Sequence, residues 1–247
     1  MAKKLACGGF SAEIGRNAIA IRRAGGRFDL VSSADGGGLM EGLDGPVRIY
    51  NGDAAPGGFA VRARAGISSA SASVASHGLT SVSALAAIDP DPCGDPGEGC
   101  GAVVALMIDA ELPPAAMARA AVTATEAVTC AFQRLMIGDP STGQIATGSD
   151  SLSVTVMCAP GCGLRLLNAG KHSKLGELIG KTVTDAALSS MGKGGATPAS
   201  RSSALARLER FGVTEETLRA YAKRGQWSAV EASLTDPLLL AYASAAI

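Results

Sequence analysis

The sequence predicts an α+β fold in which mixed or antiparallel sheets pack against helices, followed by a small helical tail. Three observations lead to this prediction. Residues 102–108 form a nearly unbroken apolar run, which is typical of a strand buried on both faces. Residues 113–136 and 173–187 carry apolar side chains at steps of three and four, as one face of a helix does. Residues 192–203 then change to Gly, Ser, Ala and basic residues, the composition of a connector.

The strands before the central apolar run are predicted from short apolar segments bounded by turn residues. Residues 18–21 and 28–31 flank the turn signal Ala24-Gly25-Gly26, so we predict a hairpin. Residues 47–50 and 81–88 are two further predicted strands.

After the long helix, residues 152–156 alternate as a half-buried strand should, and residues 165–168 form a second predicted strand. The core is therefore expected to run strand, helix, strand, strand, helix. We divide the chain into a core of residues 1–191, a linker of residues 192–203 and a helical extension of residues 204–247.

The extension carries start and stop signals for three short helices, at residues 204–211, 214–223 and 227–233. Residues 237–247 are apolar, so they pack either on the core or on a neighbouring subunit; in the second case the protein is a homo-oligomer.

The overall composition excludes several classes of partner. The 247 residues carry no net charge and show no basic stripe with interleaved aromatic residues, which argues against nucleic acid. There is no apolar run of about eighteen residues, so we expect no membrane insertion. The amino-terminal residues lack the apolar segment of a signal peptide, so we expect a cytoplasmic protein with reduced cysteines.

The segment most suggestive of chemistry is GKHSKLGELIG at residues 170–180. It holds one of the two histidines of the chain beside two lysines and a glutamate, at the start of a predicted helix. Histidine is the side chain that most readily exchanges protons near neutral pH, so His172 is the natural proton carrier. The alternative is that the segment is only a solvated helix cap.

Three carboxylates are further candidates, each with a structural alternative. Glu177 serves the site or forms a surface ion pair with Lys181. Asp150 orients His172 or a water, or it caps its own turn. Glu126 lies at the edge of the apolar stripe of the long helix, where it is half-buried at a site or exposed to water.

Other motifs point away from metal and nucleotide binding. Cys158 and Cys162 are spaced for metal binding, but no second pair of ligands accompanies them, so we predict no zinc site. The glycines at 36–38 and 57–58 match no nucleotide-binding fingerprint. His77 is a loop histidine that contacts ligand or is simply solvated.

Taken in order along the chain, these motifs resemble the adenosylcobinamide amidohydrolase family. The resemblance rests on GKHSKLGELIG at 170–180, TGSD at 147–150 and TATEA at 123–127, and it spans residues 27–190. SSA at 32–34 followed by Gly37-Gly38, with Asn51 after the next strand, is similar to the amino-terminal motif of the family.

The resemblance implies a corrinoid-salvage enzyme. It would hydrolyse the amide between the propionyl arm of the corrin ring and aminopropanol, with the cobalt-containing corrinoid as substrate. The sequence itself shows no required cofactor and no metal site. The implied catalytic residues are His172, Glu177, Asp150 and Glu126. The implied substrate-binding residues are Lys171, Lys174, Ser173, Ser149, Thr147, Asn51, Gly37 and Gly38.

The sequence departs from the family pattern at two places. The family usually has Gly-Thr-Ile-Asn at the start of the central strand, where this chain has GCGA at 99–102. Either Cys100 takes over the missing hydroxyl's role or that position is not catalytic. The family's Ala-Thr-Gly-Thr-Gly-Thr-Asp run is also altered in this chain, where only its end is recognisable, as TGSD at 147–150. The alternatives are therefore an amidohydrolase or acyltransferase acting on another small metabolite, or a non-catalytic corrinoid-binding protein.

A fainter resemblance links the central strand, Asp109 and the long helix to amidases and acyltransferases that cleave themselves ahead of a Ser or Thr nucleophile. This resemblance implies a layered α/β/β/α fold. Aligning on Asp109 puts Gly101 at the nucleophile position, and glycine offers no nucleophile. We therefore expect no self-cleavage by that route.

Overall fold

The structure is a computed structural model of the chain. The described residues are 9–52, 57–64, 66–89, 101–139, 142, 145–149, 151–194, 212–221, 226 and 229–230, with the backbone of 3–7.

A six-stranded mixed sheet forms the centre of the molecule. Its strand order is β5-β4-β11-β10-β9-β8. The strands are β4 (Phe28–Ser32), β5 (Gly38–Leu43), β8 (Ser71–His77), β9 (Thr80–Ile88), β10 (Ala102–Ile108) and β11 (Leu152–Cys158). β10 and β11 pair in parallel and the other neighbours pair antiparallel. Every residue of β10 is buried, which confirms the predicted central strand.

A second sheet of five strands has the order β1-β2-β3-β6-β7. Its strands are β1 (Lys3–Cys7), β2 (Phe10–Ile14), β3 (Ala18–Arg23), β6 (Val47–Tyr50) and β7 (Ala60–Arg62). A short 3-10 helix, η1 (Ile67–Ser69), leads into β8 of the six-stranded sheet. Together with the helices, the two sheets confirm the predicted α+β class.

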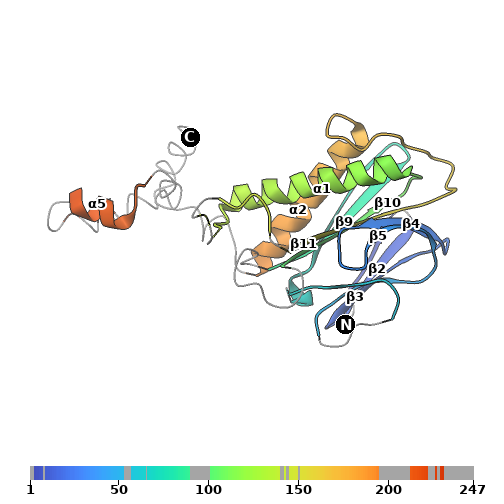
Figure 1. Cartoon of the computed structure of the whole chain (residues 1–247), viewed down its shortest axis with the longest axis horizontal. Coiled ribbons are helices and arrows are strands. Elements are labelled where there is room, and N and C mark those ends of the chain that lie inside the picture. The colour runs from blue at the N-terminus through green and yellow to red at the C-terminus, as the bar shows by residue number, and fades with distance from the viewer. Residues whose placement is uncertain are drawn as a thin grey trace.

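Two helices cover the outer face of the six-stranded sheet, and the five-stranded sheet covers its inner face (Figure 1). Helix α1 spans Pro114–Leu135 and helix α2 spans Lys174–Lys193. Alternation along the strands builds both interfaces. In β10, Val104 and Leu106 pack in the helix-facing core, whereas Ala105 and Met107 pack in the core between the sheets. In the described residues the layering is therefore helix, sheet, sheet.

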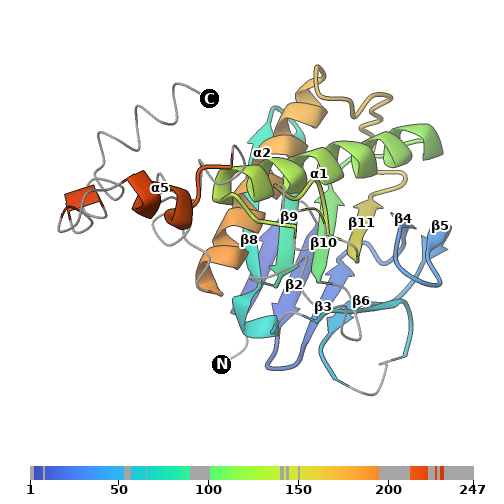
Figure 2. The same ribbon diagram turned by 60° about the vertical axis from the view of Figure 1, so that its left-hand side comes forward.

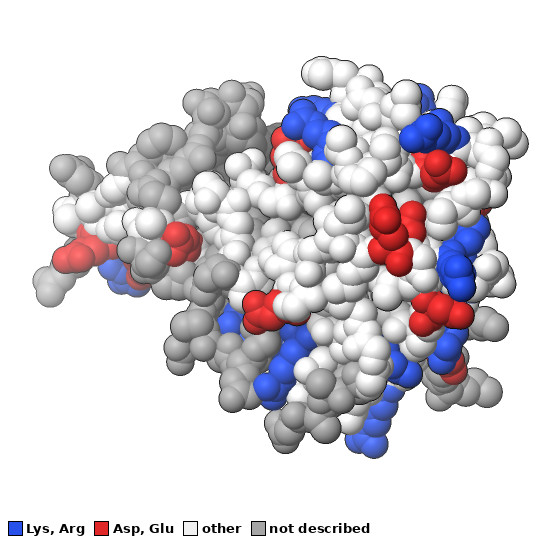
Figure 3. All heavy atoms as spheres, turned by 45° about the vertical axis from the view of Figure 1, so that its right-hand side comes forward, with Lys and Arg blue, Asp and Glu red and all other residues white. Residues whose placement is uncertain are grey.

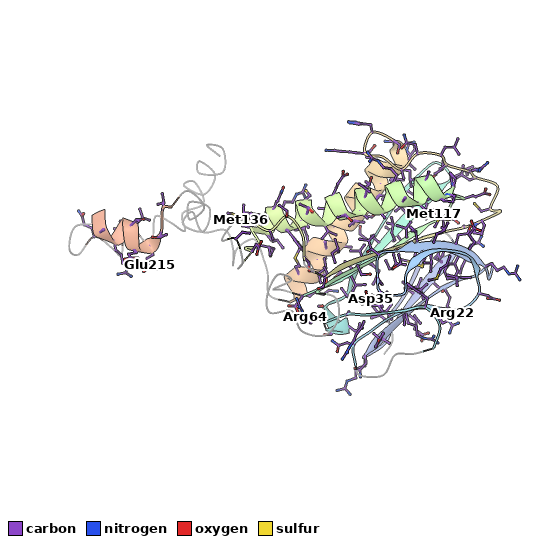
Figure 4. The ribbon with its side chains drawn as sticks, in the orientation of Figure 1. Arg22, Asp35, Arg64, Met117, Met136 and Glu215 are labelled. Atoms are coloured by element: carbon purple, nitrogen blue, oxygen red, sulfur yellow. The ribbon has the colours of Figure 1, made fainter. Side chains whose placement is uncertain are left out.

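Helix α1 crosses over α2 on this outer face (Figure 2). Two contacts fix its position. Near its amino end, the Met117 sulfur lies 3.8 Å from the Cys158 sulfur of β11; Met117 is labelled in Figure 4. Further along, the Thr184 hydroxyl of α2 donates to the Ala127 carbonyl at 3.3 Å. The crossing places the polar sides of the two helices next to each other.

The predicted hairpin of residues 18–21 and 28–31 is wrong. β3 belongs to the five-stranded sheet, where it pairs with β2 and β6, whereas β4 pairs with β5 and β11 in the other sheet. The turn between them carries the chain from one layer to the next, and the Ala24 N–H donates to Gly9 rather than closing a hairpin. Local turn signals cannot distinguish a hairpin from such a change of layer, since both need glycine.

The predicted strand at residues 165–168 is also wrong. This segment makes a single bridge, between Arg165 and Glu111, and no ladder. Arg165 is held by an ion pair to Glu111, and Leu167 is exposed. The core therefore runs strand, helix, strand, helix, and the connection from β11 to α2 is a long loop.

The predicted helices of the core, at residues 113–136 and after Ser173, are confirmed, but the buried face of the first is shifted. Leu175, Ile179 and Val183 of α2 are buried as expected. On α1, however, Ala118, Val122 and Thr125, which belong to the predicted stripe within residues 113–136, are exposed. The buried stripe of α1 consists mainly of small side chains, namely Ala116, Met117, Ala120, Thr123, Ala124, Ala127, Val128, Ala131, Phe132 and Leu135. Alanine packs closely against the sheet but gives a weak hydrophobic signal in the sequence.

The carboxyl-terminal part contributes helix α5 (Glu215–Tyr221), which agrees with the predicted helix at 214–223 and lies apart from the layered body (Figures 1 and 2). Helix α2 ends at Lys193, two residues beyond the predicted core boundary. The predicted helix at 204–211 and most of the linker lie outside the described residues. Within the described chain, no helix combines the length and apolar character needed to span a bilayer.

Candidate functional site

A cleft of about 910 Å³ lies between α1, α2 and the loop that precedes α2. Polar and charged side chains dominate its walls. The lining residues are Arg119, Thr123, Glu126, Ala127, Cys130, Arg134, Asn168, Gly170, Lys171, His172, Gly176, Glu177, Gly180, Lys181, Thr184 and Asp185. The volume falls in the range of about 300–1,000 Å³ typical of small-molecule sites.

One wall is a polar stripe on α1. Its residues at 119, 123, 126, 130 and 134 recur at steps of three and four, so they share one face of the helix. Arg119 and Arg134 stand about 22 Å apart along the axis at the helical rise per residue. The stripe gives the cleft one cation near each end and a carboxylate, Glu126, between them.

The opposite wall begins at the amino end of α2, where the chain is held tightly. Ser173 caps the helix: its hydroxyl accepts from the Gly176 N–H at 3.0 Å and donates to the Gly170 carbonyl at 2.8 Å. The Thr123 hydroxyl of α1 donates to the Ala169 carbonyl at 2.9 Å. A side chain at Gly176 would collide with the Gly170 carbonyl, so glycine is required there. The loop that carries His172 is therefore fixed to both helices.

Gly180, one turn further along α2, has the opposite environment. A β-carbon built there would meet nothing within 4 Å. Its missing side chain leaves open space in the wall of the cleft. The absence of a side chain at Gly180 therefore widens the cleft, and no close contact requires glycine at this position.

The structure brings four of the predicted site residues together. His172, Lys171, Glu177 and Glu126 all line the cleft, and each is exposed to solvent. Glu177 has a partner, because Lys174 donates to its carboxylate at 2.5 Å. This hydrogen bond, and the charge of the same ammonium group, lower the pKa of Glu177 from its ordinary value. The sequence had predicted Lys181 as the surface partner; the pair instead forms with Lys174.

The remaining predicted residues are placed elsewhere. Lys174 and Ser173 flank the cleft without lining it, and the Ser173 hydroxyl serves as the helix cap. The Thr147 carbonyl accepts from Thr129 at 2.7 Å, and the Asn51 amide donates to the Arg64 carbonyl at 3.1 Å. Asp150 and Cys100 lie outside the described residues.

Ser149 belongs to a second polar group, which we term the strand-end cluster, at the end of β4 and around the first half of β11. Its members are Ser32, Ser33, Ser149, Ser151 and Thr155. Ser32 and Thr155 share a buried hydrogen bond of 2.8 Å, and Ser33 accepts from the Val154 N–H at 3.0 Å. Ser151 accepts from the Gly101 N–H at 2.7 Å, and Ser149 from the Ser151 N–H at 3.3 Å. These hydroxyls hold neighbouring backbone in place.

Gly37 and Gly38 follow this cluster. A β-carbon at Gly37 would lie 2.5 Å from the Ser32 carbonyl oxygen and 2.6 Å from that of Ala34, while Gly38 has φ of 108°. Both positions therefore need glycine for the turn into β5. Neither lines the cleft between the helices.

Sequence reasoning missed several lining residues that the structure reveals. They are Arg119, Thr123, Cys130, Arg134, Asn168, Thr184 and Asp185. A signal for those on α1 exists in the sequence, since polar residues recur at helical spacing beside the apolar stripe. In the described part of the chain, no hydrogen bond or ion pair engages the charged groups of Arg119, Glu126 and Arg134. These groups are available to a ligand.

No group of three or more His, Cys, Asp or Glu in the described residues is arranged to hold a metal ion. Cys158 is buried in the helix-facing core and Cys162 is exposed. Burial raises the pKa of the Cys158 thiol to about 11, so this cysteine stays protonated and serves packing.

Charge is mixed on one face of the protein, as it is in the cleft. On the face shown in Figure 3, basic and acidic side chains are interspersed, and neither sign forms a continuous patch. The structure is that of an α+β protein with a candidate small-molecule site, a cleft lined by groups that can exchange protons or form hydrogen bonds.

Comparison with known proteins assigns the family. Residues 57–197, more than half of the chain, match the family model of adenosylcobinamide amidohydrolase. The chain therefore belongs to the adenosylcobinamide amidohydrolase family, which confirms the resemblance found in the sequence. An uncharacterized protein of Methanocaldococcus jannaschii is 40% identical over 90 residues, which cover 36% of this chain and 34% of that relative. The chain thus matches about a third of the relative's length.

Proposed function

We propose that this protein hydrolyses the aminopropanol amide of adenosylcobinamide, giving adenosylcobyric acid and 1-aminopropan-2-ol in corrinoid salvage. One observation carries the proposal. Every residue that lines the cleft, from Arg119 to Asp185, falls within the segment that matches the family. The part of the chain that resembles an amidohydrolase is therefore also the part that forms the polar cleft.

The size and lining of the cleft support a corrinoid as the ligand. At about 910 Å³ the cleft is near the upper end of the usual range for small-molecule sites, as a large flat ring requires. A corrinoid carries amide side arms, which need both donors and acceptors. The lining supplies donors through Arg119, Arg134 and Lys181. It supplies acceptors through Glu126 and Asp185.

The proposed reaction adds water across the C–N bond of the amide. The water oxygen joins the carbonyl carbon, the C–N bond breaks, and the products are a carboxylate and an alkylammonium ion. His172 is proposed to take a proton from the attacking water and to return it to the leaving nitrogen. Glu126 faces the same cleft and is proposed to orient the water or the histidine. Asp150 and Glu177 remain proposed members of the catalytic group.

The test is incubation of the purified protein with adenosylcobinamide, following release of 1-aminopropan-2-ol by mass spectrometry. We expect amine release by the wild type. His172→Gln should lower kcat by roughly 10²- to 10⁴-fold, the usual contribution of a general acid–base group. Circular dichroism should be unchanged, because His172 is exposed and lies outside the core.

The matched control is His77→Ala, which removes the other histidine of the chain. His77 ends β8, is exposed and does not line the cleft; its charge makes only a minor contribution to the lowered pKa of Glu177, which Lys174 dominates. Amine release by this variant should stay within about twofold of the wild type. If the wild type binds adenosylcobinamide but releases no amine, the protein is a corrinoid-binding protein rather than an enzyme. If it neither binds nor cleaves this substrate, the corrinoid assignment fails and the shared family indicates only a shared fold.

A further inference from the structure

The end of the cleft next to the loop before α2 differs in charge from the rest. Arg119 of α1 approaches Lys171 and His172 of the loop there. The approach is close: a β-carbon built on Gly170 would lie 3.3 Å from the Arg119 Nε and 3.8 Å from its Nη2. The guanidinium group thus rests against the backbone immediately before Lys171 and His172, in space that a larger residue at position 170 would fill.

Hydrogen-bond donors dominate this end. In the described residues, the side chains of Arg119, Lys171 and His172 have no hydrogen-bond or ion-pair partner. Asn168 also lines it, and its side-chain oxygen already accepts from the Gly170 N–H at 2.8 Å. The amide nitrogen of Asn168 is therefore the half that faces a ligand, and it too is a donor.

The carboxylates of the cleft are kept away from these donors or are already paired. Glu126 is seven residues along α1 from Arg119, about 10 Å at the helical rise. Glu177 is paired with Lys174 at 2.5 Å. Asp185 lies on α2 beyond Thr184, which contacts α1 at Ala127 rather than near Arg119. A site with several donors and no free carboxylate close by favours an anionic group on the ligand.

We propose that Arg119, Lys171 and the amide nitrogen of Asn168 form an anion subsite beside His172 that binds the carboxylate created by amide hydrolysis. This inference rests on the proposed function and deepens it, because it fixes where the cleaved arm of the corrinoid lies. Before cleavage the subsite holds the amide carbonyl oxygen, which accepts hydrogen bonds but carries no full charge. After cleavage the same donors face a carboxylate, and their hydrogen bonds become charge-assisted and stronger. The acid product is therefore retained more tightly than a neutral amide.

The experiment compares two corrinoids that differ at one group. One is adenosylcobyric acid, and the other is the same corrinoid with a primary carboxamide in place of that carboxylate. Binding is measured by isothermal titration calorimetry, so the readout does not depend on turnover. At low salt the wild type should bind the acid about tenfold more tightly than the carboxamide. The preference should shrink as salt is raised, because exposed charges are screened.

The variants separate this subsite from general charge in the cleft. Arg119→Gln should weaken binding of the acid more than binding of the carboxamide and so remove the preference for the acid, whereas Arg119→Lys should keep part of the preference. The matched control is Arg134→Gln, which removes an arginine from the same stripe at the opposite end of the cleft. It should keep the preference for the acid.

Each contrary outcome is informative. If the wild type binds acid and carboxamide equally, the anion subsite is wrong, and the proposed function stands as long as amine is released from adenosylcobinamide. If Arg134→Gln loses the preference as fully as Arg119→Gln does, the effect comes from overall charge and the subsite is again wrong. If neither corrinoid binds, this inference fails, and release of amine from adenosylcobinamide still decides the proposed function.

Discussion

The cleft between the helices and the strand-end cluster are both rich in polar residues, yet they use them in opposite ways. In the cleft, the charged groups of Arg119, Glu126 and Arg134 have no partner among the described residues. In the strand-end cluster, the hydroxyls of Ser32, Ser33 and Ser151 bond to neighbouring strands and turns. In the sequence, both regions are polar motifs beside a strand or helix. In the structure, the cleft is a candidate binding site, whereas the strand-end cluster supports the fold.

The glycines of the two regions show the same contrast. Gly37, next to the strand-end cluster, has no room for a side chain, because two carbonyl oxygens lie within 2.6 Å of where its β-carbon would be. A β-carbon built on Gly180, in the cleft, would have nothing within 4 Å. Folding therefore requires the first glycine, whereas the second creates space that a ligand can use. The comparison predicts that mutations in the cleft change ligand binding, and that mutations in the strand-end cluster change stability.

The largest effect is expected for Gly180→Leu. The new side chain would occupy the open part of the cleft and should weaken binding of adenosylcobinamide by roughly 100-fold, a steric loss similar to that of filling a ligand pocket. The fold should be kept, since leucine is a better helix former than glycine by up to about 1 kcal/mol. Calorimetric titration measures the loss of binding, and thermal unfolding shows whether the fold is kept. Unchanged binding would mean that the cleft is not the corrinoid site.

Gly37→Ala should do the reverse. Its methyl group would press against the Ser32 and Ala34 carbonyls, and we expect a loss of about 1–3 kcal/mol in the free energy of unfolding. Urea denaturation measures this loss, and corrinoid affinity of the folded fraction should stay within about twofold. A stable Gly37→Ala variant with weakened binding would contradict the structural role of this glycine and favour the predicted substrate-binding one.

The hydrogen bond between Ser32 and Thr155 gives a test within the strand-end cluster. Ser32→Ala leaves the Thr155 hydroxyl buried without its partner and should cost about 1–3 kcal/mol of stability. Adding Thr155→Val removes the orphaned hydroxyl, so the double variant should lose less than the sum of the two single losses. Chemical denaturation of the two single variants and the double variant gives the free energies of unfolding for this double-mutant cycle. Additive losses would mean that the two hydroxyls do not interact.

The smallest effect concerns the ion pair at the amino end of α2. Lys174→Met removes the ammonium group that lowers the pKa of Glu177, so this pKa should rise toward its ordinary value. A lowered carboxyl pKa stabilises the fold above the ordinary pKa, and the contribution disappears as the pH falls through the lowered value. The stability of variant and wild type should therefore converge at acidic pH. NMR titration of the Glu177 carboxyl checks the direction, and an unchanged or lower pKa would contradict the pairing.

Much of the fold could be predicted from the sequence, because its signals are local. The buried strand β10 follows from a continuous apolar run, and helices α1 and α2 follow from apolar spacing with prolines or a serine at their starts. The sheet that each strand joins could not be predicted. β3 and β4 each have a clear strand pattern, but the pattern does not say which sheet a strand joins.

The candidate site was predictable only in part for a related reason. His172 and Glu177 lie five residues apart, so one motif reveals both. Glu126 was predicted from its place at the edge of an apolar stripe and from the family resemblance. Arg119, Cys130 and Arg134 are separated from the motif at 170–180 by more than thirty residues and were not predicted. They join it because α1 lies across α2 and because Thr123 and Thr184 bond one element to the next.

The sequence by itself determined which segments form the central strand and the two helices, and which residues carry the amidohydrolase family motifs. These properties depend on side chains a few positions apart, through burial periodicity, capping and motif spacing. Only the tertiary structure decided which polar residues are available to a ligand. Whether the hydroxyl of Ser32 or the guanidinium of Arg119 is already bonded depends on the elements packed beside it, and those come from distant parts of the chain.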